Sequence, residues 1–201
     1  MRDKGNWNIQ RHMKYQLIFM WLYVFALYLP FCILMVHRHD VGHISISVIG
    51  WFSGGLQYLI AYLALTLPFC LYQLFFLNRH FAGNHKWVYM ASSMSCALMT
   101  IGGFIPLRRE EQYLLVNTIH EFVSVGSTIV FMSIILAVLI LCAGKSRRKL
   151  LFYVLCGIFP LGLLVGFLIL WTAALFQLLA TLSFLLVLLC VNTVFVRRPA
   201  P

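Results

Sequence analysis

The sequence has 201 residues, of which 62% are hydrophobic and 10% are charged, and its mean hydropathy is +0.92. Soluble domains carry about 25% charged residues, so this composition excludes an ordinary soluble domain and indicates a single polytopic membrane domain. The net charge of +10 does not indicate nucleic-acid binding, because the basic residues lie between apolar runs, where membrane topology accounts for them.

Six apolar runs are long enough to cross about 30 Å of hydrocarbon, which takes about 20 helical residues. The first run has no small-residue cleavage site, so it is expected to be a retained helix rather than a signal peptide. The predicted fold is therefore an all-α bundle of six transmembrane helices in one domain over residues 1–201. These helices are expected at residues 15–36, 48–76, 88–106, 114–142, 150–170 and 174–195.

The distribution of Lys and Arg predicts the topology. All but three of the 15 basic residues lie in the N-terminal segment, in the loops at 78–87 and 143–149, or at the C-terminus. The three others are Arg38, Arg108 and Arg109. By the positive-inside rule, both termini are predicted to be cytoplasmic in a multi-pass protein of the cell membrane.

Polar residues within the predicted helices gather toward the predicted outer side. On the fourth helix, His120, Glu121 and Ser124 recur at steps that place them on one face. An ionisable residue within a span is costly and normally faces the bundle interior or a wet cavity. We therefore predict an outward-facing pocket with two arginines at its mouth. Its residues are Ser53, Gln57, His120, Glu121 and Gln177, with Arg108 and Arg109 at the mouth.

Two outer loops carry further candidate ligands. The guanidinium groups of Arg108 and Arg109 are suited to clamping a phosphate, and the alternative is salt bridging with the two glutamates that follow. In the first outer loop, His37, His39 and His43 have the ligand type for zinc or copper. Their spacing matches no closed zinc site and Arg38 would repel a cation, so we predict no metal and keep these histidines as weak candidates.

Known motifs for nucleotide binding, hydrolysis or haem attachment do not occur in the sequence, and no cofactor is predicted. The six cysteines lie in or beside apolar runs without a CxxC pair, which predicts packing residues.

Gly162 and Gly166 form a GxxxG pair, the small-residue pattern that lets two membrane helices approach closely. Three prolines within the runs, Pro30, Pro68 and Pro160, predict helix kinks.

Two stretches carry a resemblance to a known group. The second helix begins with ISISVIG at residues 44–50, and the third ends with GGFIP at residues 102–106, followed by a charged loop and a histidine. Over roughly residues 44–141 the chain resembles a group of six-helix membrane proteins that includes bacterial members of unknown function and the damage-regulated autophagy modulator and its relatives. The matching residues are Ser47, Gly50, Gly103, Pro106 and His120. Glu121 and the histidine-rich loop depart from the pattern. The resemblance implies membrane lipid handling or membrane-linked regulation.

Three functions are compatible with these features. The first is non-enzymatic binding of a lipid headgroup or small amphiphile, with membrane lipids as partners. The second is a membrane-embedded lipid-modifying enzyme that uses His120 and Glu121. The third is a small accessory subunit of a larger membrane complex, with a partner on the face of the fifth helix. The one-sided placement of the polar residues favours the first.

Overall fold

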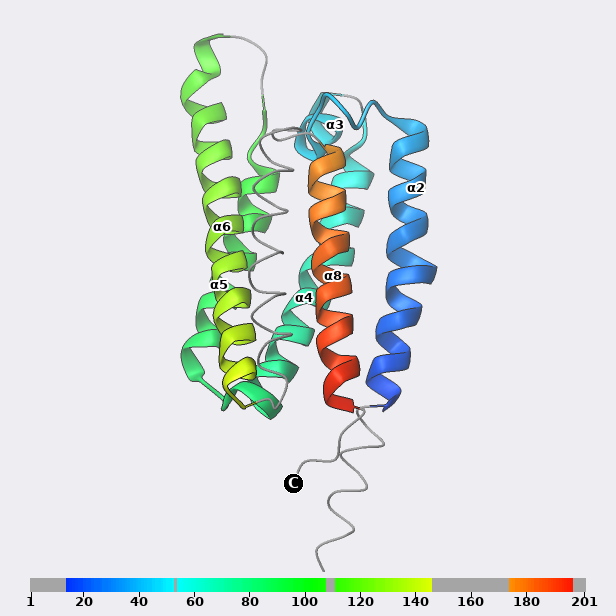
Figure 1. Cartoon of the computed structure of the whole chain (residues 1–201). Helices are drawn as coiled ribbons and strands as arrows, with labels where there is room; N and C mark the ends of the chain where they lie inside the picture. The colour runs from blue at the N-terminus through cyan, green and yellow to red at the C-terminus, as the bar shows by residue number, and fades with distance from the viewer. Residues whose placement is uncertain (1–13, 53, 108–110, 146–173, 197–201) are drawn as a thin grey trace, which may run out of the picture.

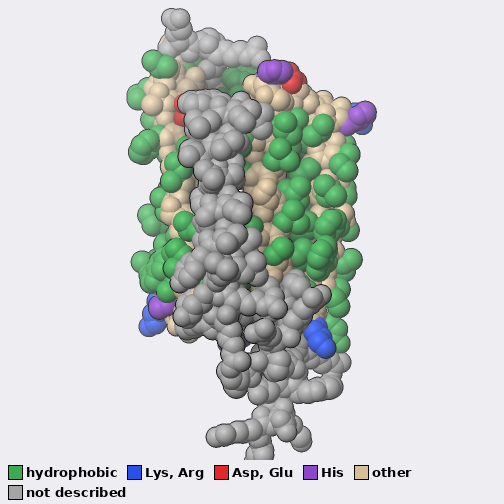
Figure 2. All heavy atoms as spheres, viewed as in Figure 1, with side chains coloured by type: hydrophobic (Ala, Val, Ile, Leu, Met, Phe, Trp, Pro, Cys, Tyr) green, Lys and Arg blue, Asp and Glu red, His purple; other side chains and the backbone are tan. Residues whose placement is uncertain are grey.

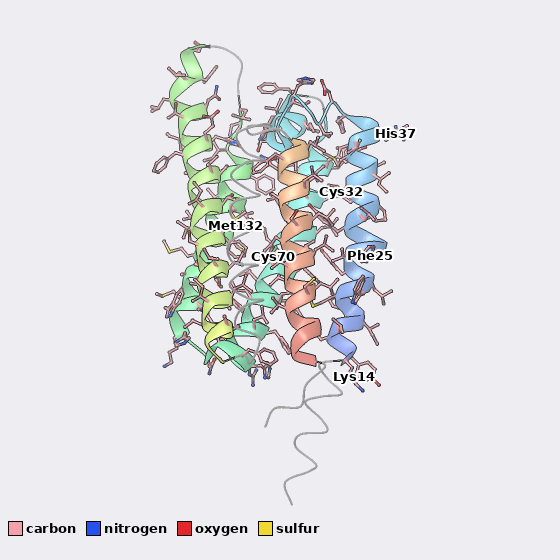
Figure 3. All side chains as sticks on the ribbon, viewed as in Figure 1. Lys14, Phe25, Cys32, His37, Cys70 and Met132 are labelled. Atoms are coloured by element: carbon pink, nitrogen blue, oxygen red, sulfur yellow. The ribbon has the colours of Figure 1, made fainter. Side chains whose placement is uncertain are left out.

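The computed structural model describes residues 14–52, 54–107, 111–145 and 174–196, and all regular structure in this part of the chain is helical. The long helices run side by side, and the short helix α3 lies across one end of the bundle (Figure 1). We call this the α3 end, where His37 lies, and we call the opposite end the Lys14 end (Figure 3). The predicted helix at 150–170 lies outside the described residues.

The first helix runs without interruption from Lys14 to Arg38, close to its predicted bounds. It includes a π-helical segment, η1 (Tyr23–Tyr28), followed by α2 (Leu29–Arg38). Pro30 has no N–H, and its ring crowds the carbonyl four residues earlier. The wider π turn just before this proline accommodates it within a continuous helix.

The run predicted as one helix over 48–76 is two helices, α3 (Ile46–Phe52) and α4 (Leu56–Leu77). Gly54 between them has a φ of 64°, a conformation that favours glycine. The N–H of Gly55 donates to the carbonyl of Ile49 at 3.2 Å. The prediction was wrong here because hydrophobicity alone does not register a Gly-Gly turn inside an apolar run.

The remaining helices begin and end within a few residues of their predicted bounds. A π-helical segment, η2 (Asn78–Ala82), extends α4, and α5 (Lys86–Phe104) follows after a short turn. A 3₁₀ segment, η3 (Glu111–Tyr113), leads into α6 (Leu114–Lys145). The last described helix is α8 (Ala174–Val196). Helices α5 and α6 make the most extensive helix pair in the described part.

Four described helices are long and apolar enough to cross a membrane, which fits an integral membrane protein. They span Lys14–Arg38, Leu56–Ala82, Leu114–Ala143 and Ala174–Val191. Among the described residues of the visible face, hydrophobic side chains occupy much of the length between the two ends, and Lys, Arg, His and acidic side chains lie toward the ends (Figure 2). Helix α5, which is rich in serine and glycine, is not among the four.

Two clusters of buried apolar side chains hold the bundle together. The larger joins the first helix, α4, α6 and α8, around residues such as Tyr28, Leu74 and Phe184. The smaller lies at the α3 end, where Ile46 and Ile49 of α3 pack with the first helix, α4 and α8. Burial of apolar surface contributes about 25 cal/mol per Å² to a fold in water. In a lipid environment, close packing and interhelical hydrogen bonds take its place.

Candidate functional site

The N-terminus of α8 is hydrogen-bonded to the loop before α3. The N–H groups of Ala174 and Leu175 donate to the carbonyls of Ile44 (2.7 Å) and Val41 (2.8 Å). In return, Gln177 Oε1 accepts the N–H of Ile46, at the start of α3, at 3.1 Å. The first N–H groups of a helix have no partner within it. Gln177, a predicted pocket residue, therefore acts as a cap for α3.

His120 is tied to the end of α5. Its Nδ1 lies 2.9 Å from the carbonyl oxygen of Ile105, the residue that caps α5. A carbonyl can only accept, so Nδ1 carries the hydrogen and donates. The side chain is 4% exposed. Because His120 reaches the residue at which α5 ends, it lies level with the end of that helix.

The Gly102-Gly103 pair lets three helices meet at this level. A Cβ added to Gly102 would lie 2.5 Å from Ser124 Oγ and 3.0 Å from Ser124 N on α6. The carbonyl of Gly103 accepts the indole N–H of Trp51, in α3, at 3.2 Å. The end of α5 is thus fixed to α6 on one side and to α3 on the other. The buried Oγ of Ser124 has no hydrogen-bond partner.

Glu121 does not share the environment of His120. Its side chain is exposed, because consecutive helical residues point about 100° apart. No hydrogen bond or ion pair of Glu121 occurs within the described residues. Its neighbour Phe122 is 79% exposed. The carboxylate therefore lies on the outer surface of the bundle, close to the level where α5 ends, while the first turns of α6 rise beyond the neighbouring helices (Figure 1).

The predicted pocket residues fall into three groups. His120 and Gln177 are engaged with backbone groups of other segments. Gln57, in the first turn of α4, and Glu121 are exposed. Ser53, Arg108 and Arg109 lie outside the described residues. No hydrogen bond joins any two of the four described members of the set.

The three histidines at residues 37–43 have separate surroundings. His43 Nδ1 lies 3.0 Å from Asp40 Oδ1, and the His39 ring packs edge-on against Tyr58 with centroids 4.8 Å apart. His37 is exposed. Within the described residues, no three His, Cys, Asp or Glu side chains are placed to hold a metal ion.

A buried amide pair near the Lys14 end was missed by sequence analysis. Gln16 Nε2 donates to Gln73 Oε1 at 3.3 Å, and the two side chains are 5% and 0% exposed. Gln16 Oε1 and Gln73 Nε2 have no hydrogen-bond partner. Buried polar residues are therefore not confined to the α3 end. Each glutamine lies near the end of an apolar run, so the sequence alone made both resemble interfacial residues.

No disulfide joins the cysteines within the described part: Cys70, Cys96 and Cys142 are buried, Cys32 is partly buried and Cys190 is exposed. Cys156, together with the Gly162–Gly166 pair and Pro160, lies outside that part.

Comparison of the chain with protein-family models, with curated proteins and with solved structures finds no match.

Proposed function

We propose that this protein is a multi-pass protein of the cell membrane, with cytoplasmic termini, that binds a lipid headgroup or small amphiphile without catalysing a reaction. The observation that supports this is the exposed carboxylate of Glu121 on a helix long and apolar enough to cross a membrane. An ionisable residue within a membrane span is expensive and marks a functional site by default. We assign its counter-charge to a positively charged ligand group at the membrane surface, because no ion pair of Glu121 occurs within the described residues.

The surroundings of Glu121 favour an amphiphile with an ammonium group. Phe122 and Leu115 are more than two-thirds exposed on the same helix, at 79% and 71%, and offer an apolar surface for hydrocarbon chains. The carboxylate accepts hydrogen bonds from the ammonium, and such charge-assisted bonds are the stronger ones. Arg108 and Arg109 are assigned to the phosphate of the same headgroup, for which guanidinium geometry is suited.

His120 has a positioning role in this proposal. Its bond to the Ile105 carbonyl joins α6 to the end of α5 and so fixes the turn of α6 that carries Glu121. A general acid or base must reach the proton that it transfers. His120 is almost fully buried and its Nδ1 is already engaged, which favours binding over catalysis.

Native mass spectrometry of the protein purified in a mild detergent tests the proposal. The wild type is expected to retain an ammonium-bearing phospholipid, and Glu121→Gln to lose it. Asp40→Asn is the matched control, because Asp40 is also an exposed carboxylate at the α3 end but is bonded to His43. Retention by Glu121→Gln would contradict the proposal.

Two other outcomes of the same measurement distinguish the alternatives. A stoichiometric zinc or copper adduct would favour the lipid-modifying enzyme. A co-purifying membrane protein, with no lipid bound, would favour the accessory subunit. That alternative is supported by Gly126 on the partly exposed surface of α6, where an added Cβ would meet nothing within 4 Å. A small residue of this kind leaves room for another helix.

A further inference from the structure

The turn between α4 and α5, at the Lys14 end, has a fixed geometry. Asn78 is fully buried, and its side chain bridges to His85. Nδ2 donates to the His85 carbonyl at 2.9 Å, and Oδ1 accepts the His85 N–H at 3.0 Å. Gly83 and Asn84 have φ values of 119° and 60°, and their N–H groups both donate to the Asn78 carbonyl. These bonds hold the end of α4 next to the start of α5 and so fix the turn.

Two basic residues lie directly beside this bridge between Asn78 and His85. Arg79 directly follows Asn78, and Lys86 directly follows His85, so the bridged pair brings their backbones together. Both side chains are exposed. Trp87, the next residue, is 43% exposed, and tryptophan is enriched where a membrane meets water. The turn therefore presents two cations beside an aromatic residue typical of the membrane surface.

The cations at this turn have no carboxylate to neutralise them within the described residues. The exposed acids Asp40 and Glu121 lie at the opposite, α3 end, and the ion pair of this part of the chain is His43–Asp40. Basic and histidine side chains lie at the lower end of the visible face, while acidic side chains lie near its upper end together with further histidines (Figure 2). The described residues therefore supply no counter-charge to Arg79 and Lys86 at this end of the bundle.

We propose that the turn between α4 and α5 binds the phosphate of an anionic phospholipid through Arg79 and Lys86. Guanidinium and ammonium groups are the usual protein partners of phosphate. A basic residue close to an anionic membrane surface gains about 1 kcal/mol, which is about fivefold in affinity. This site is independent of Glu121, because it lies at the other end of the bundle and selects the opposite charge.

Binding is measured by titrating phosphatidylglycerol and phosphatidylcholine into the detergent-solubilised protein and reading adducts by native mass spectrometry. Arg79→Gln and Lys86→Gln are each expected to lower the preference for phosphatidylglycerol about fivefold, and the double variant about thirtyfold. Arg38→Gln, which removes one exposed cation at the α3 end, is expected to leave the preference unchanged. An equal loss in Arg38→Gln, or no loss in the double variant, would overturn the proposal.

Two further arms make the result decisive. The charge-conserving variant Arg79→Lys/Lys86→Arg is expected to retain the preference, so that a folding defect in the double variant cannot imitate a lost site. Inorganic phosphate at the same concentration as the lipid is expected not to displace phosphatidylglycerol. Displacement by phosphate would assign the turn to a soluble anion and overturn the lipid assignment. Glu121→Gln is expected to leave the binding of phosphatidylglycerol itself intact, which separates the outcome from that of the proposed function.

Discussion

Gly102 of α5 and Ser124 of α6 lie in backbone contact, so that a Cβ on the glycine would stand 2.5 Å from Ser124 Oγ and 3.1 Å from its Cα. This close approach brings His120, one turn earlier on α6, within 2.9 Å of the Ile105 carbonyl. The same contact sets the height along the bundle at which the exposed side chain of Glu121 lies. The end of α5 is therefore the support on which the candidate site depends.

Gly102→Ala is expected to destabilise the protein, because the added methyl group meets backbone atoms of α6 that cannot move aside cheaply. Overpacking of this kind costs about 1–3 kcal/mol. Thermal unfolding in detergent measures it. Gly126→Ala on α6 is the control, because its Cβ would meet nothing within 4 Å, and it should unfold at or slightly above the wild-type temperature. Equal losses in the two variants would mean that the close approach is not specific.

His120→Leu should lower stability by about 1–3 kcal/mol, since it leaves the Ile105 carbonyl without its donor. His120→Asn retains a donor close to the position of Nδ1 and is expected to recover part of the loss. The two variants are compared by thermal unfolding and by retained lipid. If both lose lipid while keeping wild-type stability, His120 contacts the ligand itself and its role is not merely positioning.

Gln177→Ala should destabilise the α3 end by about 0.5–2 kcal/mol, the usual cost of removing a helix cap. Gln177→Glu keeps an accepting oxygen for the Ile46 N–H and should be milder. Gln57→Ala serves as the control, because Gln57 is exposed and exposed substitutions usually stay within about 0.5 kcal/mol. Hydrogen exchange at Ile46 reports the cap directly. Unchanged protection in Gln177→Ala would show that this cap does not hold α3.

The Gln16–Gln73 pair should behave as a coupled unit. Either single change to Leu leaves the other amide buried without a partner and should cost about 1–3 kcal/mol. The double change removes both polar groups and should recover much of that loss. A double-mutant cycle on unfolding free energies measures the coupling, which is expected to reach about 0.5–3 kcal/mol. Additive losses would show that the two amides do not depend on each other.

The helices could be predicted from the sequence wherever hydrophobicity decides the structure. The first helix, α6 and α8 lie close to their expected bounds because long apolar runs have few alternatives in a membrane. The break between α3 and α4 could not be obtained in this way. It depends on the positive φ of Gly54, a conformational freedom that a hydropathy window does not weigh.

Sequence analysis singled out polar residues within the helices but did not give their individual contacts. His120 and Gln177 drew attention as polar residues in apolar helices, yet each bonds to a backbone group far along the chain, at Ile105 and Ile46. Helical spacing shows which residues share a face, but not which neighbour that face meets. For the same reason, Glu121 and His120 seemed equivalent in the sequence, although one is exposed and the other buried.

The most direct test of Glu121 as a headgroup ligand compares lipid retention in nanodiscs of phosphatidylethanolamine and phosphatidylglycerol. Glu121→Gln should retain at least about tenfold less phosphatidylethanolamine than the wild type, since a hydrogen bond to a charged group contributes about 1.5–3 kcal/mol. Its retention of phosphatidylglycerol, which has no ammonium group, should be unchanged, and Asp40→Asn should match the wild type for both lipids. Equal retention of phosphatidylethanolamine by Glu121→Gln and the wild type would contradict the proposed function.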